Sequence, residues 1–145
     1  MRTKTLFLFV FLFTGMVFSQ QSNTGKPISF NEVMSLLEIG RLNTLKMTIK
    51  EYGYVPDMEN SDTYRKILPK LKSMHKFKIY RKNKTDEYFT YLELNLTAER
   101  EESLKADAST AGFKIVEEDP ENIEMSNNSF VISLIKGQQI EITKK

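Results

Sequence analysis

Apolar residues recur at helical spacing in three segments of the chain. Ser29–Glu32 has the sequence of a capping box, and the apolar positions that follow it predict a helix over 30–39. The same spacing predicts a second helix over 42–52, and Thr97 can cap a third that runs to about residue 111. A glycine follows each segment where a helix is expected to stop: Gly40, Gly53 and Gly112.

Elsewhere the period changes to alternation, which is typical of strands. It predicts strands over 75–80 and 89–94 with a turn at 82–86, a short extended piece at 54–55 that Pro56 interrupts, a strand over 113–116, and a hairpin of 129–135 with 138–143. Residues 63–74 allow two interpretations, because Tyr64, Ile67 and Leu71 have helical spacing whereas Pro69 would break a helix. Residues 117–128 have the composition of a polar loop.

Together these elements predict an α+β fold with an antiparallel sheet of five or six strands and helices on one face. After the first helix, the order is one helix and three strands, given twice. A tandem αβββ duplication preceded by an extra N-terminal helix explains this order. Chance similarity explains it as well, since a glycine followed by an aromatic residue commonly ends a helix.

This element order, over roughly Leu42 to Thr143, resembles small exported bacterial modules built of tandem helix-plus-three-strand units. PepSY domains and proteins like the β-lactamase inhibitory protein are such modules. The resemblance implies a binding protein or inhibitor that presents the exposed face of an antiparallel sheet to its partner.

The beginning of the chain has the three-part pattern of a secretory signal peptide. Arg2 and Lys4 precede an apolar stretch that ends at Phe18, and small residues favour cleavage after Ser19. The apolar stretch is shorter than the ~20 residues of a membrane-spanning helix, and no cysteine follows it to carry a lipid anchor. We therefore expect a signal peptide at 1–19, a flexible lead-in at 20–27, a single domain at 28–145 and no stable membrane anchor.

The amino-acid composition indicates in which compartment the protein works and which classes of partner it binds. The chain has no cysteine, which favours a bacterial source and an exported protein of the periplasm or the medium over a eukaryotic disulfide-bonded domain. Removal of Arg2 and Lys4 leaves equal numbers of basic and acidic residues. This balance argues against binding to nucleic acid or to a membrane surface, since both depend on an excess of cations.

No catalytic or metal-binding motif is recognisable. His75 is the only histidine and the chain has no cysteine, so histidine-pair and thiol chemistry are excluded. A surface or half-buried packing role is expected for His75. The acidic loop at 57–62 lacks the ligand spacing of an EF-hand. We expect a non-enzymatic protein without cofactor or metal.

Charge is segregated along the chain. Residues 64–84 contain nine basic residues and no acid, whereas residues 86–124 contain twelve acids and three basic residues. Alternation places four side chains on one face of the strand that follows residue 74, and these are the candidate binding residues: Lys76, Lys78, Tyr80 and Lys82. The same lysines could instead keep a strand soluble and discourage edge pairing.

The predicted function is that of a small exported binding protein, inhibitor-like in form, whose basic strand takes an acidic protein or an anionic glycan of the envelope. Two alternatives remain open. One is a small hydrolase of cell-wall or glycan material that uses carboxylates such as those at 117–121. The other is an envelope protein with a structural role only.

Overall fold

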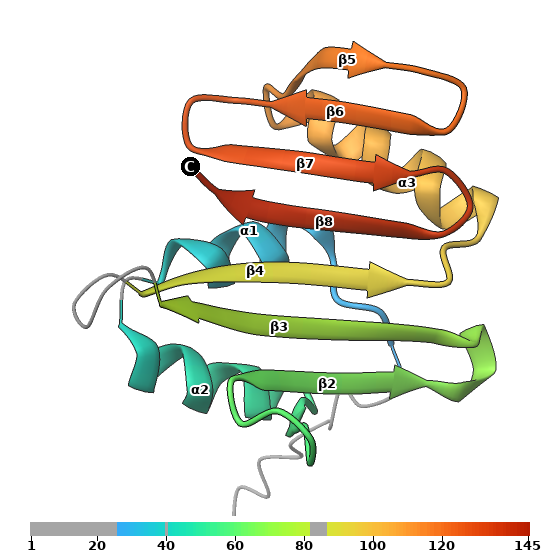
Figure 1. Ribbon diagram of the computed structural model, residues 1–145. Coiled ribbons are helices and arrows are strands. Elements are labelled where there is room, and N and C mark those ends of the chain that lie inside the picture. Colours follow the sequence, from blue (N-terminus) through green and yellow to red (C-terminus); the bar gives the residue numbers. More distant parts are fainter. Residues whose placement is uncertain (1–25, 40, 82–86) are drawn as a thin grey trace, which may run out of the picture.

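The strands of the computed structural model join in one antiparallel sheet backed by helices (Figure 1). The structure describes residues 26–39, 41–81 and 87–145. The predicted signal peptide, most of the lead-in, Gly40 and the turn at 82–86 lie outside the described residues.

Within the described residues the helices are α1 (Phe30–Glu38), α2 (Leu42–Glu51) and α3 (Ala98–Thr110), and a 3₁₀ turn spans Pro69–Leu71. The strands are β1 (Val55–Pro56), β2 (Thr63–Leu68), β3 (Ser73–Arg81), β4 (Glu87–Leu94), β5 (Lys114–Glu118), β6 (Asn122–Ser126), β7 (Phe130–Ile135) and β8 (Gln139–Lys144).

The sheet has eight strands in the order β1-β2-β3-β4-β8-β7-β6-β5, so the expectation of five or six strands was wrong. Two four-strand meanders meet where β4 pairs with β8. One helix precedes each meander, which gives two successive units of one helix and four strands. We call α2 with β1–β4 the N-terminal half, and α3 with β5–β8 the C-terminal half.

The two additional strands are β2 and β6. In β2 the residues that face the helices are Tyr64, Lys66 and Leu68, and the lysine hides the apolar alternation. The helical spacing seen in 63–74 has no helical counterpart beyond the 3₁₀ turn that starts at Pro69. β6 lies in the stretch taken for a polar loop, where only Ile123 and Met125 are buried.

Each half turns from its helix into its first strand in the same way. Gly53 and Gly112 have φ of 85° and 81°, a region that favours glycine because a Cβ is disfavoured there. The amide of Tyr54 donates to the Ile49 carbonyl at 3.1 Å, and that of Phe113 donates to the Ala108 carbonyl at 3.0 Å. Both joints have a glycine followed by an aromatic residue, and they also share their backbone geometry.

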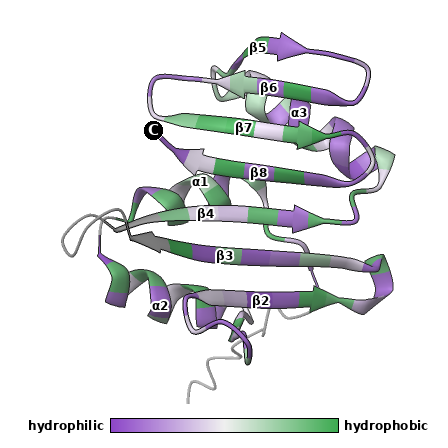
Figure 2. Ribbon diagram, viewed as in Figure 1, coloured by the Kyte–Doolittle hydropathy of each residue, from purple (hydrophilic) through white to green (hydrophobic). Residues whose placement is uncertain are grey.

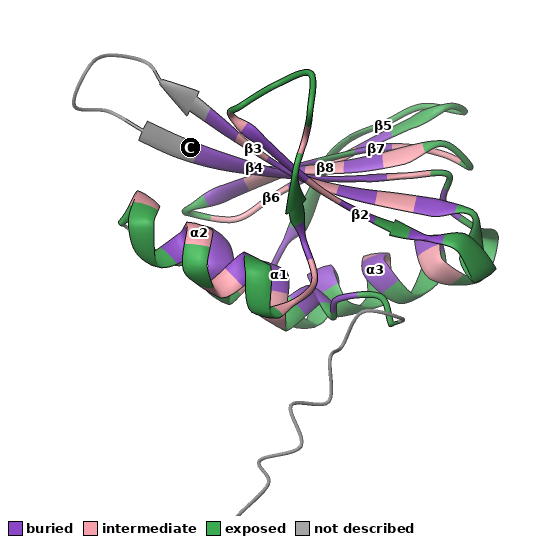
Figure 3. Cartoon of the chain, turned by 90° about the horizontal axis from the view of Figure 1, so that it is seen from below, coloured by how far each residue is buried: buried purple, intermediate pink, exposed green. Residues whose placement is uncertain are grey.

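All three helices lie on one face of the sheet, as predicted (Figure 3). The capping box at the start of α1 is present: the Glu32 amide donates to Ser29 Oγ at 3.3 Å, and the Ser29 amide donates to Glu32 Oε2 at 2.8 Å. α1 lies behind the centre of the sheet, between the other two helices (Figure 1). The rings of Phe30 and Phe113 meet edge to face, 5.9 Å apart.

The core is a single cluster between the sheet and the helices. Buried apolar residues alternate with polar ones along β6, and Figure 2 shows this change of hydropathy from residue to residue. In the C-terminal half, three residues of β7 and two of β8 form an entirely apolar inner surface: Phe130, Ile132, Leu134, Ile140 and Ile142. Within the described residues, no helix is both long and apolar enough to span a membrane.

Candidate functional site

The face of the sheet that points away from the helices, here called the open face, is not covered by a described helix, and the loop between β1 and β2 rises on this side (Figure 3). Because successive side chains of a strand point to opposite faces, the buried side of β3 defines its other side. Phe77 and Ile79 are buried on the helix side. Lys76 and Lys78 therefore lie on the open face, where both are half-buried.

Arg65 joins these lysines from the neighbouring strand. It pairs with Lys76 in the β2–β3 ladder, and Thr63 pairs with Lys78. Neighbouring strands lie ~4.8 Å apart, so the three cations form one group. We call Arg65, Lys76 and Lys78 the basic patch.

The structure brings together two of the four predicted binding residues, Lys76 and Lys78. Tyr80 belongs to β3 and pairs with Tyr88, and Lys82 lies outside the described residues. Arg65 was missed because its segment could not be assigned to a strand from the sequence. Its place beside Lys76 follows from the register of β2 against β3, which no local pattern gives.

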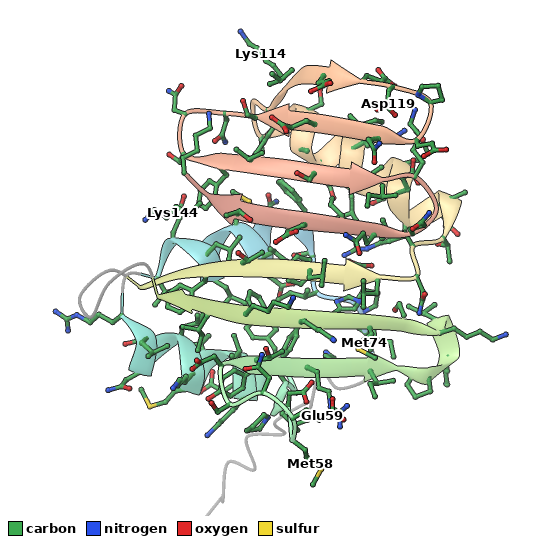
Figure 4. The ribbon with its side chains drawn as sticks, viewed as in Figure 1. Met58, Glu59, Met74, Lys114, Asp119 and Lys144 are labelled. Carbon is green, nitrogen blue, oxygen red and sulfur yellow. The ribbon has the colours of Figure 1, made fainter. Side chains whose placement is uncertain are left out.

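The C-terminal half of the open face carries carboxylates in the same row. From Lys76 the ladder passes through Leu92, Glu141, Ser133, Glu124 and Glu117. We call Glu117, Glu124 and Glu141 the acidic patch, and they line a hollow of about 410 Å³ together with Asp119. Figure 4, which looks onto the open face, shows Asp119 and Lys114 at the β5 edge and Met58 and Glu59 beyond β2. The open face therefore changes sign from one half of the molecule to the other.

On the helix side, β2–β4 carry polar residues where β6–β8 are apolar. Lys66, His75 and Glu93 are neighbours in adjacent strands and are only 4%, 0% and 2% exposed. Tyr91 from β4 and Arg100 from α3 complete the group. We call these five residues, Lys66, His75, Tyr91, Glu93 and Arg100, the buried polar cluster.

Glu93 is the centre of this cluster. Arg100 binds both of its carboxylate oxygens, with Nε 3.0 Å from Oε1 and Nη2 3.0 Å from Oε2. Arg100 Nη2 also donates to the Ile28 carbonyl at 2.8 Å, and so ties α3 to the segment that precedes α1. The Tyr91 hydroxyl donates to Glu93 Oε2 at 2.9 Å. A buried carboxylate is thus paired and hydrogen-bonded, as its desolvation requires.

His75 is held on the other side of Tyr91, with Nδ1 2.8 Å from the hydroxyl oxygen. The histidine tautomer decides which of these two atoms donates. The other ring nitrogen, Nε2, lies 3.6 Å from Glu93 Oε1 and has no hydrogen bond among the described residues. The expectation that His75 lies at or near the surface was wrong, since its exposed fraction is 0%.

Burial sets the protonation of the cluster. It lowers the pKa of His75 to about 4, against the opposing attraction of Glu93. Burial likewise raises the pKa of Tyr91 and lowers the pKa of Lys66, whose Nζ donates to the Tyr52 carbonyl at 2.7 Å. Near neutral pH the histidine is therefore uncharged, and it has no surface with which to reach a substrate.

One hollow borders the cluster, at the end of the sheet where β3 begins, β4 ends and α3 starts. It measures about 270 Å³, and Ser73, Glu93 and Arg100 contribute to its lining. Ser73 is 6% exposed, and its hydroxyl has no hydrogen-bond partner in the described structure.

Of the acids proposed for hydrolysis, Glu117 and Glu118 belong to β5, and Asp119 and Glu121 lie in the β5–β6 turn. Asp119 Oδ1 accepts the amides of Glu121 and Asn122 at 2.7 and 2.6 Å, and these hydrogen bonds lower the pKa of Asp119. A general acid requires the opposite shift. In the 57–62 loop, Asp57 and Asn60 similarly accept backbone amides of their own loop. No group of three or more potential metal ligands occurs among the residues that the structure describes.

Comparison with known proteins gave no match to this chain among family models, curated proteins or solved structures.

Proposed function

We propose that this protein is an exported, non-enzymatic binding protein that takes an acidic protein partner on the open face, at the basic patch. The observation that carries the proposal is the combination of an uncovered sheet face with segregated charge on it. The basic patch lies on β2 and β3, and the acidic patch lies on β5, β6 and β8.

The distribution of charge favours a protein over a glycan. Six strand spacings separate β2 from β5, which corresponds to roughly 30 Å across the face. A partner that spans this distance meets cations at one side and carboxylates at the other. A folded protein can present both signs in the matching order, whereas a uniformly anionic glycan complements only the basic side.

Two further parts of the proposal concern origin and location. We attribute the two halves to tandem duplication of a unit of one helix and four strands, supported by the equal helix-to-strand joints at Gly53 and Gly112. We also propose export after cleavage following Ser19. Intact mass of the protein recovered from periplasm and medium tests the cleavage: a chain that begins at Gln20 supports it, and a full-length chain contradicts it.

The binding proposal is tested by affinity capture from envelope and culture-supernatant extracts of the source, at low and high salt. Wild type is compared with K76E/K78E and with a control of equal charge change, K46E/K50E, on α2 in the helix layer. We expect one salt-sensitive protein partner that the control retains and K76E/K78E loses. Equal capture by all three contradicts the proposal. Salt-sensitive binding to an anionic polysaccharide column alone, lost in K76E/K78E, would transfer the site to a glycan.

A further inference from the structure

The strand order of the sheet is symmetric about the seam between β4 and β8, where the two halves meet. Each strand of one half has a counterpart at the same distance on the other side of the seam: β3 has β7, β2 has β6, and β1 has β5. Two sheets can pack face to face with their strands nearly aligned. When a second copy of this chain is placed on the open face, with a two-fold axis along the seam, each strand faces its counterpart in the other copy.

The basic and acidic patches occupy corresponding places in this arrangement. One ladder row crosses the whole face, with Arg65 and Lys76 on one side of the seam and the acidic patch on the other. Arg65 then faces Glu124 of the second copy, and Lys76 lies between Glu124 and Glu141. The angle of roughly 30° between aligned sheets shifts facing positions, and these long side chains accommodate the shift. The two-fold axis repeats each contact, so a cation meets a carboxylate at both ends of the interface.

The charges of both patches are available to a partner. The ion pairs of the described residues join other groups, such as Glu93 with Arg100 and Glu118 with Lys136, and none of them includes a residue of either patch. The whole chain has a formal net charge of only +2, so two copies do not repel each other strongly over long range. The charge pattern of the open face therefore favours association with a copy of itself.

A second row of the open face supplies apolar contact. It runs beside the charged row and contains four apolar side chains: Ile67, Met74, Leu94 and Ile135. In the two-fold arrangement, Met74 on β3 faces Ile135 on β7 of the second copy. Ile67 is 51% exposed, and packing a second copy on this face removes such apolar surface from water. Eight strands ~4.8 Å apart and about 20 Å long give the face roughly 700 Å² of flat area, near the ~800 Å² that each partner of a standard interface buries.

The loop between β1 and β2 rises at one edge of the open face, beyond β2 (Figure 3, Figure 4). It contains Glu59 and Met58, and Met58 is 94% exposed. Because β1 faces β5 of the second copy, this loop reaches the opposite edge, where Lys114 and the exposed Val116 lie. Glu59 and Lys114 have opposite charges, and Met58 and Val116 are both apolar. The loop therefore fits along the β5 edge of the second copy.

We propose that the open face is the interface of a two-fold symmetric dimer of this chain, in which the basic patch of each copy pairs with the acidic patch of the other. The inference rests on the proposed function, because it uses the same face and names a second copy as the partner. Affinity capture from the source would then recover this chain itself. The dimer is tested with purified protein, so its failure and the failure of the proposed function are separate results.

The test is sedimentation velocity of the protein expressed from its full sequence, in a concentration series at low and high salt. We expect a dimer at micromolar concentration that becomes at least about tenfold weaker at high salt. R65E/K76E and E124K/E141K should each be monomeric under the conditions in which wild type is a dimer. The control K46E/K50E, on α2 in the helix layer, should dimerise as wild type does. Circular dichroism checks that each variant is folded.

An equimolar mixture of the two charge variants tests the pairing of the patches. R65E/K76E carries acidic groups on both sides of the seam, and E124K/E141K carries mainly basic ones. Neither complements itself, whereas a mixed pair restores attraction at both contacts. We therefore expect the mixture to form the dimer. Because the chain has no cysteine, T143C, beside the axis, should be cross-linked to a second copy by a short bismaleimide, whereas K46C should not.

Four results would overturn the dimer. They are wild type that stays monomeric up to ~100 μM, charge variants that dimerise as wild type does, a mixture of folded variants that stays monomeric, and cross-linking through K46C in place of T143C. If wild type is monomeric and capture still recovers a different acidic protein through the basic patch, the dimer is wrong and the proposed function stands.

Discussion

The two halves of the molecule have the same strand pairing but different interiors. In the N-terminal half, Lys66, His75 and Glu93 are neighbours across β2, β3 and β4. In the C-terminal half, Met125, Ile132 and Ile142 are neighbours across β6, β7 and β8 on the same side of the sheet. The C-terminal half shows that an apolar interior satisfies this backbone.

The open face differs in the same systematic way. The basic patch lies on the N-terminal half and the acidic patch on the C-terminal half, although Arg65 and Lys76 share one ladder row with the acidic patch. Neither the polar interior nor the charge pattern is required by the shared topology. The features that need a functional explanation therefore lie mainly in the N-terminal half, which contains the basic patch and most of the buried polar cluster.

The largest effect is expected when the buried ion pair is broken. R100M keeps most of the side-chain volume but leaves the Glu93 carboxylate, 3% exposed, without its cation. Removing one partner of a buried pair typically costs about 3–5 kcal/mol of unfolding free energy. Urea denaturation followed by circular dichroism measures it, with R65M on the open face as the matched control. If R100M loses no more unfolding free energy than R65M, the pairing of Glu93 with Arg100 does not stabilise the fold.

Acid should destabilise the protein through His75. Its folded pKa of about 4 lies below the ordinary value of 6.5, so between these values the unfolded chain binds the additional proton. The stabilisation is present above pH 6.5 and is lost as pH falls toward 4, by on the order of 2–3 kcal/mol. Unfolding free energies from pH 7 to pH 4 measure this slope, which should be shallower in H75I. Equal slopes of unfolding free energy against pH in wild type and H75I would show that His75 does not cause the loss of stability in acid.

The similarity of the two joints gives a smaller effect. G53A and G112A each place a Cβ at a positive φ, which costs roughly 1–2 kcal/mol. A Cβ at Gly112 would meet no atom within 4 Å, so backbone strain alone acts there. Thermal denaturation of the two variants should give comparable losses. A much larger loss at one joint would indicate that the two turns are not equivalent in their surroundings.

The sequence predicted the elements whose signals are local. Ser29 and Glu32 identified the start of α1, Gly112 the end of α3, and alternation in β3 the exposure of Lys76 and Lys78. It failed where long-range pairing decides the outcome. Lys66 occupies a core position and concealed β2, and β6 has only Ile123 and Met125 to reveal it.

The polar interior was also beyond local patterns. The partners of His75 come from β4 and α3, and only the register and the docking of α3 bring Tyr91, Glu93 and Arg100 to it. A lone histidine in a strand carries no sign of these neighbours. Two of the three residues of the basic patch were predicted, and Arg65 was missed for the same reason, because it is brought next to Lys76 by strand pairing.

The central claim is that the fold does not need the polar interior of the N-terminal half. Its most direct test is the unfolding free energy of H75I/Y91F/E93I/R100M, which replaces the paired groups together by apolar ones of similar size. Because replacing a complete buried network is commonly neutral or stabilising, we expect a value equal to wild type or higher by about 1–4 kcal/mol, with an unchanged circular dichroism spectrum. A loss approaching that of R100M alone would contradict the claim and make the cluster a structural requirement of this half.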